Sequence, residues 1–293
     1  MYYYIVNPAA GNGSLKTTQE KLRQMLDELG IRGEWAKTTG PGEASKMAAA
    51  AVAKGHTTII AVGGDDTVNE VMNGIDSDTV AIGIIPMGAT NSLANQLGIT
   101  SWQQACTVLA ARRLTSYSLI AAGQKYFLST LTLGFETELD KQIENAPTGF
   151  NGRLRTFLAS WSQAKEFQAL RCHIKVDDTF TIESNVFSLS IANQKFLNPL
   201  ASDRLLVSLS DRPAKRLALG GFLWKLIHSG TAGAHVEEHA TTRFLAEKVI
   251  IETHPSTGIM LDGKVAGRTP IAIRLTDRKL KFITERIESG LRG

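Results

Sequence analysis

The chain of 293 residues has little cysteine, no long apolar run and almost no excess of charge of either sign. Its two cysteines, Cys106 and Cys172, both stand among apolar residues, which favours buried thiols in a reducing compartment over a disulfide. No stretch reaches the roughly 18 uninterrupted apolar residues that a membrane span needs. The first residues, MYYYIVNPAAG, lack the basic and long apolar regions of a signal peptide. These absences predict a cytoplasmic protein, with any membrane contact peripheral and at the inner face.

The charge balance is weak because 32 lysines and arginines oppose 28 aspartates and glutamates, which gives a net charge of +4. So small a bias does not indicate nucleic-acid binding, whereas it is compatible with anionic substrates or with a basic patch facing a membrane. Hydrophobic residues make up 43% of the chain, which is a globular composition. The length favours two domains, and the sequence leaves the oligomeric state open, a homodimer included.

Residues 57–75, TTIIAVGGDDTVNEVMNGI, contain the most informative pattern of the chain. β-Branched and apolar residues before the two glycines predict a buried strand, and the apolar spacing after them predicts a helix. Gly63 and Gly64 predict a tight turn whose N–H groups, at the positive end of a helix dipole, can bind phosphate. Asp65 beside them is well placed to hold Mg²⁺ on that phosphate.

Strands and helices alternate over the first part of the chain. We predict strands at 2–6, 34–39, 57–62 and 80–85, and helices at 15–29, 43–54, 91–97 and 102–111. This order is typical of a doubly wound parallel sheet, in which ligands bind beyond the carboxyl ends of the strands. Three glycine-bearing loops, at 8–13, 63–67 and 86–90, follow such ends. We therefore expect them to form one anion site.

Beyond about residue 120 the pattern changes to consecutive strands with few helices. We predict strands at 117–122, 126–133, 170–176, 186–192, 205–209, 249–252 and 271–275, with a turn at 177–178 and a helical insertion at about 150–168. Such an order favours an antiparallel, β-rich second domain.

The three loops together resemble those of the diacylglycerol kinase-type lipid kinases of bacteria. That family shares its nucleotide-binding domain with sphingosine kinases and, more distantly, with NAD kinases and phosphofructokinases. Residues 7–11, NPAAG, are similar to its first phosphate loop, and residues 63–71, GGDDTVNEV, to its GGDGTxNEV signature. Residues 85–91, IPMGATN, are similar to its PxGTxND loop, and residues 261–263, LDG, to the segment with its DGE motif.

The resemblance implies phosphorylation of the hydroxyl of a diacylglycerol-like lipid, with ATP and Mg²⁺ as cofactors and transient contact with the membrane. It implies a nucleotide-binding domain at 1–120, completed by roughly 277–293, and a lipid-acceptor domain at 121–276. The nucleotide residues that it implies are Asn7, Pro8, Ala9, Ala10, Gly11, Thr38, Gly63, Gly64, Asp65, Asp66, Thr67, Asn69, Glu70, Gly88, Thr90 and Asn91.

Catalytic roles can be assigned within the same resemblance. Asp65 is the expected metal ligand, and Asp203 is a second, weaker candidate in a loop with Arg204 beside it. Asp262 is the expected proton acceptor, and Lys264 could neutralise charge that develops on the phosphoryl group. The alternative for Asp262 is an ordinary Asp-Gly turn between two strands.

The sequence departs from the family pattern at five functional positions. Asp66 stands for the third glycine of GGDGT, Ala89 and Ser92 for the threonine and aspartate of GTxND, Lys264 for the glutamate of DGE, and residues 202–204 for a DDG core. These departures leave open a catalytically lapsed relative that binds nucleotide or lipid. A kinase that uses pyrophosphate, or a soluble acceptor such as NAD, also stays open.

Asp66 has two interpretations. Near the phosphates, a second carboxylate at about 4 Å would repel them by roughly 4 kcal/mol at a surface-like dielectric constant. In the distantly similar phosphofructokinases, GGDD in place of GGDG accompanies pyrophosphate as the donor. Alternatively, Asp66 turns outward as the N-cap of the following helix.

Two further stretches carry minor alternatives. Residues 235–239, HVEEH, match the spacing of a zinc hydrolase site, although glycines just before them weaken the expectation of a helix. Residues 212–229 mix basic and large apolar side chains. They could rest on anionic lipid or pack on their own domain.

Overall fold

The computed structural model describes residues 2–88, 91–135, 137, 160–162, 164, 166–198, 201–211 and 242–285. The chain forms two compact units. The first unit contains residues 1–119, 195–201 and 276–293, and the second contains residues 120–194 and 202–275. Two strands, β5 (Leu114–Ala122) and β16 (Ile271–Ile283), begin in one unit and end in the other.

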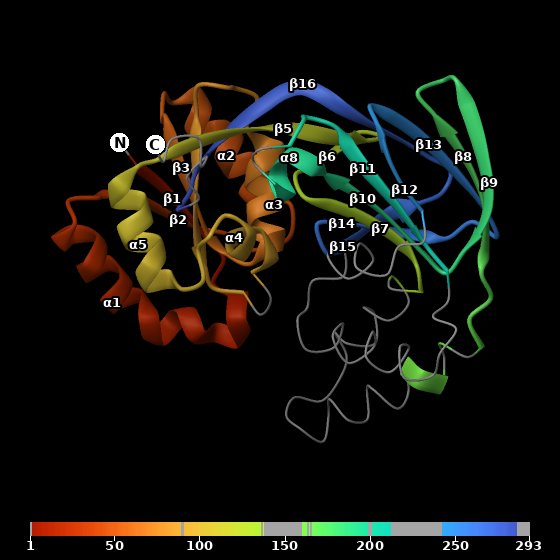
Figure 1. Ribbon diagram of the computed structural model, residues 1–293. Coiled ribbons are helices and arrows are strands. Elements are labelled where there is room, and N and C mark those ends of the chain that lie inside the picture. Colours follow the sequence, from red (N-terminus) through yellow and green to blue (C-terminus); the bar gives the residue numbers. More distant parts are fainter. Residues whose placement is uncertain are drawn as a thin grey trace, which may run out of the picture. The chain divides into compact units, whose positions relative to one another are not determined.

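Parallel strands form the centre of the first unit (Figure 1). They are β1 (Tyr2–Val6), β2 (Gly33–Lys37), β3 (Thr58–Gly63) and β4 (Ala81–Pro86), in the order β2-β1-β3-β4, followed by the end of β16. The helices are η1 (Ala10–Gly13), α1 (Ser14–Glu28), α2 (Glu43–Ala53), α3 (Asp65–Gly74), α4 (Ser92–Gln96), α5 (Trp102–Ala111) and α8 (Gln194–Leu197). Every residue of β3 and β4 is buried, as parallel strands covered on both faces require.

Helices cover both faces of this parallel sheet. Helix α1 packs on α5, and α2 packs on α3. Figure 1 shows the first pair on one side of the strands and the second pair on the other. The predicted doubly wound sheet is therefore confirmed, and each predicted helix of this unit lies within a few residues of its expected bounds.

The second unit is built from antiparallel strands. They are β6 (Lys125–Phe127), β7 (Thr130–Gly134), β8 (Leu170–Val176), β9 (Phe180–Val186), β10 (Ser188–Asn193), β11 (Leu205–Ser210), β12 (Thr242–Ala246), β13 (Lys248–His254), β14 (Gly258–Leu261) and β15 (Lys264–Arg268). One six-stranded sheet has the order β12-β11-β10-β7-β14-β15. The strands β13, β8 and β9 belong to the sheet that contains β16, and they follow it in the order β16-β13-β8-β9. One hydrophobic cluster, which includes Leu131, Val207 and Val249, joins both sheets. The predicted antiparallel second domain is confirmed.

The predicted single strand at 126–133 is wrong, because the chain forms β6 and β7 with a break between them. The backbone N–H groups of residues 128–130 all donate to the carboxylate of Asp262, at 2.8–2.9 Å. Groups bonded to a side chain cannot pair with a neighbouring strand, so the extended pattern is interrupted at this point.

Strands β9 and β12 have no counterpart in the prediction from sequence, and β14 and β15 were anticipated only in the alternative of an Asp-Gly turn between two strands at Asp262. Strands β12 and β15 are the two edges of the six-stranded sheet. Most of their residues are exposed or only half-buried. An edge strand with few buried side chains lacks the apolar alternation by which strands are recognised, which explains why these two were missed.

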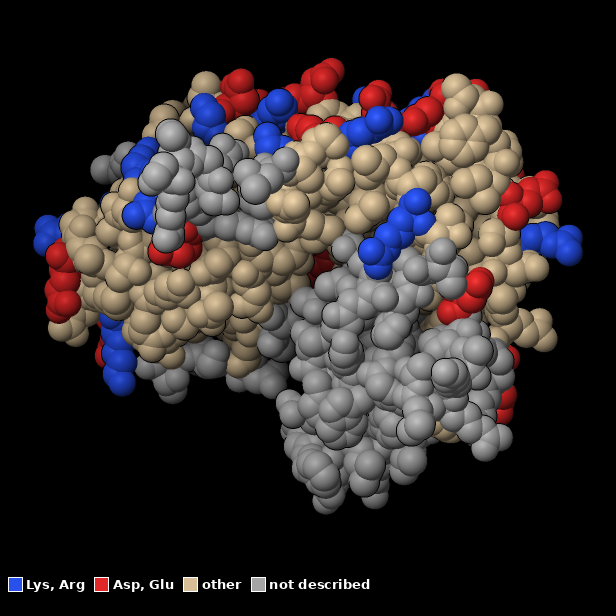
Figure 2. Space-filling view, in the orientation of Figure 1, with Lys and Arg blue, Asp and Glu red and all other residues tan. Residues whose placement is uncertain are grey.

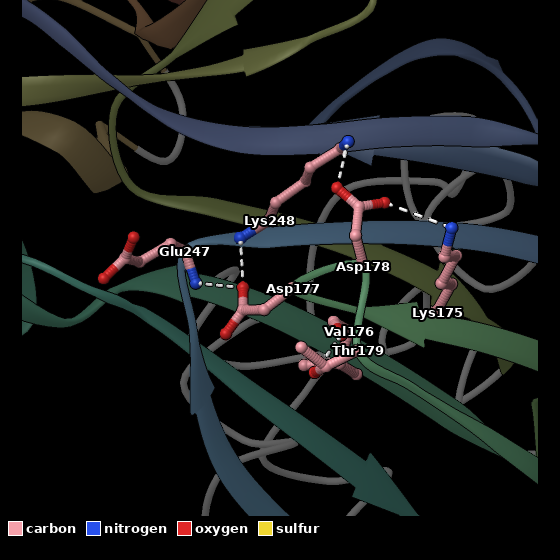
Figure 3. Close-up of polar contacts among 7 residues, drawn as sticks. All are labelled: Lys175, Val176, Asp177, Asp178, Thr179, Glu247 and Lys248. Carbon is pink, nitrogen blue, oxygen red and sulfur yellow. Dashed lines mark hydrogen bonds and ion pairs between the residues drawn. The ribbon is translucent and has the colours of Figure 1, made fainter.

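The predicted turn at residues 177–178 is confirmed, and it joins β8 to β9 (Figure 3). Asp177 and Asp178 both have positive φ, at 48° and 56°, as a tight hairpin turn requires. The carboxylate of Asp177 accepts the N–H groups of Glu247 and Lys248, each at 2.8 Å. Hydrogen bonds from the ammonium groups of Lys248 and Lys175 lower the pKa of Asp178. The turn is thereby attached to the corner between β12 and β13.

Both cysteine thiols are buried and unoxidised, as predicted. Burial raises the pKa of Cys106 to about 11 and that of Cys172 to about 12. Because the thiolate is the reactive species, we expect neither thiol to react with iodoacetamide at pH 8 in the folded protein. Mass spectrometry should show alkylation of both only after denaturation, and rapid modification of the native chain would contradict the buried placement.

Several expectations from sequence fall outside the described residues. These are the stretches at 212–229 and 235–239 and most of the helical insertion at 150–168. Among the described residues, no helix has the length and apolar character that crossing a membrane requires. Figure 2 shows basic and acidic side chains interspersed over the described part of the visible face, in keeping with the weak net charge.

Candidate functional site

Three loops meet at the carboxyl ends of β1, β3 and β4. Val6 pairs with Val62, and Gly63 pairs with Pro86, so these three strands end side by side. The backbone continues this order beyond the strands, because Asn7 N–H donates to Val62 O and Met87 N–H donates to Gly63 O, both at 2.9 Å. The predicted convergence of the glycine-bearing loops is present in the first unit.

Gly64 and Gly88 bring two of these loops into backbone contact. A Cβ atom added to Gly88 would lie 2.5 Å from the Cα of Gly64 and 2.9 Å from the Oδ1 of Asn91. Real Cβ atoms do not approach other atoms so closely, so a side chain at position 88 would push the loops apart. The glycines are required here for the close approach of two backbones.

Asn91 and Asp65 hold the loop that follows β4 through side-chain hydrogen bonds to its backbone. The side chain of Asn91 binds both sides of the Gly88 residue, since its Oδ1 accepts the N–H at 2.8 Å and its Nδ2 donates to the C=O at 2.9 Å. The carboxylate of Asp65 accepts the N–H groups of Ser92 and Leu93, each at 2.9 Å. Asp65 thus begins α3 and also holds the start of α4, a second role that the sequence did not reveal.

Asn7 joins the first loop to the second. Its Nδ2 donates to the hydroxyl of Thr67 at 3.2 Å, and its Oδ1 accepts the N–H of Ala9 at 3.0 Å. Thr38, at the end of the neighbouring strand β2, is buried and donates its N–H to Val6 O at 2.8 Å. Residues from β1, β2 and β3 therefore lie around the same end of the sheet.

Helix α3 begins at this point with the geometry of an anion site. Its N-cap is Gly64, in extended conformation and without a side-chain cap. Asp65 and Asp66 stand in its first turn, where negative charge interacts favourably with the helix dipole. The alternative in which Asp66 is the N-cap is therefore wrong, and its side chain is exposed.

Glu70 has a positioning role that differs from direct nucleotide contact. Its carboxylate accepts the N–H groups of Gly42 and Ala44, at 2.8 and 3.2 Å, and so caps α2 from a neighbouring helix. The capped segment follows Thr38, so Glu70 holds the loop on which this residue lies. The sequence around Glu70 gave no indication that this side chain caps a different helix.

Glu70→Ala is expected to destabilise the protein by about 1–2 kcal/mol, because two N–H groups of α2 lose their acceptor. If the loop at 38–44 contributes to nucleotide binding, the KM for ATP should rise several-fold with little change in kcat. Thermal unfolding and steady-state kinetics measure the two effects. Glu20→Ala, an exposed glutamate of α1, is the matched control, and equal behaviour of the two variants would contradict the cap.

Asp262, in the second unit, lies in the turn between β14 and β15 with φ at 49°. The alternative of an Asp-Gly turn therefore describes its backbone correctly. Its side chain is buried, however, and accepts the N–H groups of Leu128, Ser129 and Thr130. Asp262 therefore organises the turn between β6 and β7 through these hydrogen bonds, whatever else it does.

The remaining predicted site residues are less defined. Lys264 is exposed at the start of β15, and its predicted role of neutralising charge on the phosphoryl group stays a prediction. Asp203 is half-buried beside Arg204, which is paired with Asp177 and Glu247. The described residues contain no group of three or more histidine, cysteine, aspartate or glutamate side chains that could hold a metal. Thr90 and Ala89 lie outside the described residues.

The first unit is a parallel α/β sheet with three glycine-bearing loops at one end, joined by Asp65 and Asn91, and in folds of this kind ligands bind beyond the carboxyl ends of the strands. Residues 1–122 match the family model "Diacylglycerol kinase catalytic domain". The resemblance seen in the loops is thereby confirmed: residues 1–122 are similar to the catalytic domain of diacylglycerol kinases, and the chain as a whole is similar to bacterial diacylglycerol kinases.

The likeness extends over nearly the whole chain. A diacylglycerol kinase of Bacillus subtilis (strain 168) is 26% identical over 280 residues, which cover 91% of this chain and 90% of that protein. A diacylglycerol kinase of Staphylococcus saprophyticus is 24% identical over 275 residues, 91% of this chain and 89% of its own. A solved structure of a putative diacylglycerol kinase from Bacillus anthracis has a TM-score of 0.70 at 21% identity, and covers 98% of each chain. At 21% identity, the similarity to this solved structure shows a shared fold and nothing further.

Proposed function

We propose that this protein transfers the terminal phosphoryl group of Mg·ATP to the hydroxyl of a diacylglycerol-like lipid. The observation that carries the proposal is the contact between the loops of Gly64 and Gly88 beside the uncapped start of α3. Backbone N–H groups at such a helix start bind phosphate without a side chain in the way. The relatives that carry the name diacylglycerol kinase supply the class of acceptor.

The donor set of the site fits a magnesium nucleotide. Asp65 supplies a carboxylate beside the glycine-bearing loop, and its two oxygens accept the N–H groups of Ser92 and Leu93. Mg²⁺ is usually held by one or two carboxylates together with phosphate oxygens and water, so a single aspartate is sufficient protein ligation. When bound, Mg·ATP would supply the phosphoryl group and neutralise its charge.

The protein's own residues position the reactants and manage the proton. Asn7, Thr67 and the start of α3 would orient the phosphates, and Asn91 would hold the loop of Gly88 against them. Asp262 is the proposed proton acceptor for the lipid hydroxyl. The same carboxylate accepts three N–H groups, which hold it in a fixed orientation.

The experiment that tests the proposal is transfer of radiolabelled phosphate to an extracted lipid pool, with ATP and pyrophosphate as alternative donors. Label is expected in a glycerolipid from ATP, and it should be strongly reduced in Asp65→Asn and Asp262→Asn. Equal label in both variants and wild type would show that these roles are wrongly assigned. No label from any donor would favour the catalytically lapsed relative.

Asp66→Gly tests the choice of donor separately. Since Asp66 is exposed in the first turn of α3, we expect ATP to bind about as tightly to the variant as to wild type, within roughly threefold. Calorimetric titration of ATP and pyrophosphate measures both affinities. A gain of several hundredfold for ATP in the variant would instead mean that Asp66 repels the nucleotide and that pyrophosphate is the better candidate donor.

A further inference from the structure

The connection between β10 and β11, residues 194–204, is closed at its base by hydrogen bonds. Residues 195–201 of this connection group with the first unit, whereas β10 and β11 themselves belong to the second. The N–H of Gln194 donates to the C=O of Arg204 at 3.0 Å, and the hydroxyl of Ser202 donates to Oε1 of Gln194 at 3.0 Å. Arg204 therefore lies where the chain re-enters the second unit.

The side chain of Arg204 faces two carboxylates from two other elements. Its Nη2 lies 3.7 Å from Oδ2 of Asp177, in the turn between β8 and β9, and 3.8 Å from Oε1 of Glu247, at the corner between β12 and β13. Its Nε is buried and has no hydrogen-bond partner among the residues that the structure describes. A charged group that is partly removed from water needs paired charges, and the two carboxylates supply them.

The carboxylates of this corner are fixed and already matched by cations of the chain. Oδ1 of Asp177 accepts the N–H groups of Glu247 and Lys248, which joins the turn to the corner (Figure 3). The neighbouring carboxylate of Asp178 is paired with Lys175 at 3.2 Å and with Lys248 at 2.7 Å. The local charge is thus balanced without an added ion.

Residues 202–204 are also the segment for which the resemblance to lipid kinases implies an acidic core, with Asp203 as a candidate metal ligand. The geometry here does not fit a divalent ion. Mg²⁺ and Ca²⁺ bind oxygen at about 2.0–2.6 Å, whereas the oxygens of Asp177 and Glu247 lie 3.7 and 3.8 Å from the nitrogen between them. Such distances suit a guanidinium group. Among the described residues, no group of three or more acidic, histidine or cysteine side chains could hold a metal.

We propose that Arg204 supplies the cation of this loop from within the chain. Its guanidinium joins the base of the β10–β11 connection to the carboxylates of Asp177 and Glu247, so the second unit needs no metal ion at residues 202–204. Arginine suits this role because its charge is permanent and its planar group can bind more than one carboxylate. The inference goes beyond the proposed function and does not depend on it. A requirement for Mg²⁺ would then belong to the first unit.

Thermal unfolding without nucleotide or lipid tests the proposal. Wild type should have the same melting temperature, within about 1 °C, in EDTA and in millimolar Mg²⁺ or Ca²⁺. Arg204→Met keeps the apolar stem but should melt about 3–6 °C lower, because two carboxylates lose their cation. Arg204→Lys keeps the charge without the planar group and should lose about half as much. Arg171→Met, at an exposed arginine of β8, is the matched control and should shift the melting temperature by less than about 1 °C.

The response to Ca²⁺ is a second readout, which a role in packing alone would not give. Without Arg204, the oxygens of Asp177 and Glu247 face one point that holds no cation, and the side chain of Glu247, 74% exposed, can move toward it. Millimolar Ca²⁺ should therefore raise the melting temperature of Arg204→Met by at least about 2 °C and leave wild type unchanged. If Arg204→Met fails to fold, Arg204→Lys carries the test, with a lower melting temperature than wild type and no response to Ca²⁺.

Three results would overturn the inference. A wild-type melting temperature that falls by several degrees in EDTA, with the fall absent from Asp203→Asn, would place a metal ion at this loop. Equal melting temperatures of Arg204→Met and Arg171→Met would show that the ion pairs do not hold the connection. Equal Ca²⁺ shifts in Arg204→Met and wild type would mean that Arg204 occupies no cation position. Absence of phosphoryl transfer by wild type, in contrast, would refute only the proposed function.

Discussion

Asp262→Ala is expected to destabilise the second unit by about 4 kcal/mol, because three backbone N–H groups lose their acceptor inside the protein. Leaving a buried donor without a partner costs about 1–3 kcal/mol, so three such losses exceed the effect of most single substitutions. Asp262 as a whole is 6% exposed, which limits replacement of its carboxylate by water. Urea unfolding followed by circular dichroism measures the change. Asp211→Ala, at an exposed aspartate, is the matched control and should change stability by less than about 0.5 kcal/mol.

Asp262→Asn separates the structural role from proton transfer. The amide keeps one oxygen, which can still accept the N–H groups of Ser129 and Thr130, but its NH₂ would face the N–H of Leu128. We expect an intermediate loss of stability together with a loss of phosphoryl transfer of at least a hundredfold. Retention of activity in a folded Asp262→Asn protein would remove Asp262 as proton acceptor while leaving its role in the β6–β7 turn intact.

Asp65→Asn is the substitution with the second largest expected effect. Phosphoryl transfer should fall by roughly a hundredfold or more, since a neutral amide is a poor ligand for Mg²⁺. Stability should fall by only about 1 kcal/mol, because one of the two N–H groups of Ser92 and Leu93 keeps an oxygen acceptor. The Mg²⁺ concentration required for half-maximal activity should rise. Asp76→Asn, 98% exposed in its side chain, is the control.

If Asp65 has only a structural role, a different result is expected for Asp65→Asn. Loss of the α4 cap alone would lower activity and stability together and leave the Mg²⁺ dependence of the remaining activity unchanged. The Mg²⁺ concentration required for half-maximal activity of Asp65→Asn therefore decides between a metal-binding and a purely structural role.

The sequence predicted the first unit well because its pattern is unambiguous. Strands β3 and β4 are buried on both faces and bounded by glycine loops, so their apolar runs and the helices after them could be located within a few residues. The same loops identified Gly64, Asp65 and Asn91 as site residues. Local spacing cannot show that the carboxylate of Asp65 caps α4, because that contact joins residues far apart in the chain.

The second unit was harder to predict for a physical reason. Its edge strands β12 and β15 bury little, so their sequences lack alternation. The break between β6 and β7 depends on Asp262, more than 130 residues away, and no local pattern contains that information.

Titration of Mg·ATP into wild type, Gly88→Ala and Gly267→Ala by calorimetry tests the central claim most directly. The added Cβ would collide with the backbone of Gly64 in Gly88→Ala, whereas at Gly267 it meets only the side chain of Ile259 at 3.8 Å. We predict Mg²⁺-dependent binding to wild type and Gly267→Ala, and binding at least tenfold weaker to Gly88→Ala. Equal affinity of all three proteins, or binding by none, would contradict a nucleotide site formed by these loops.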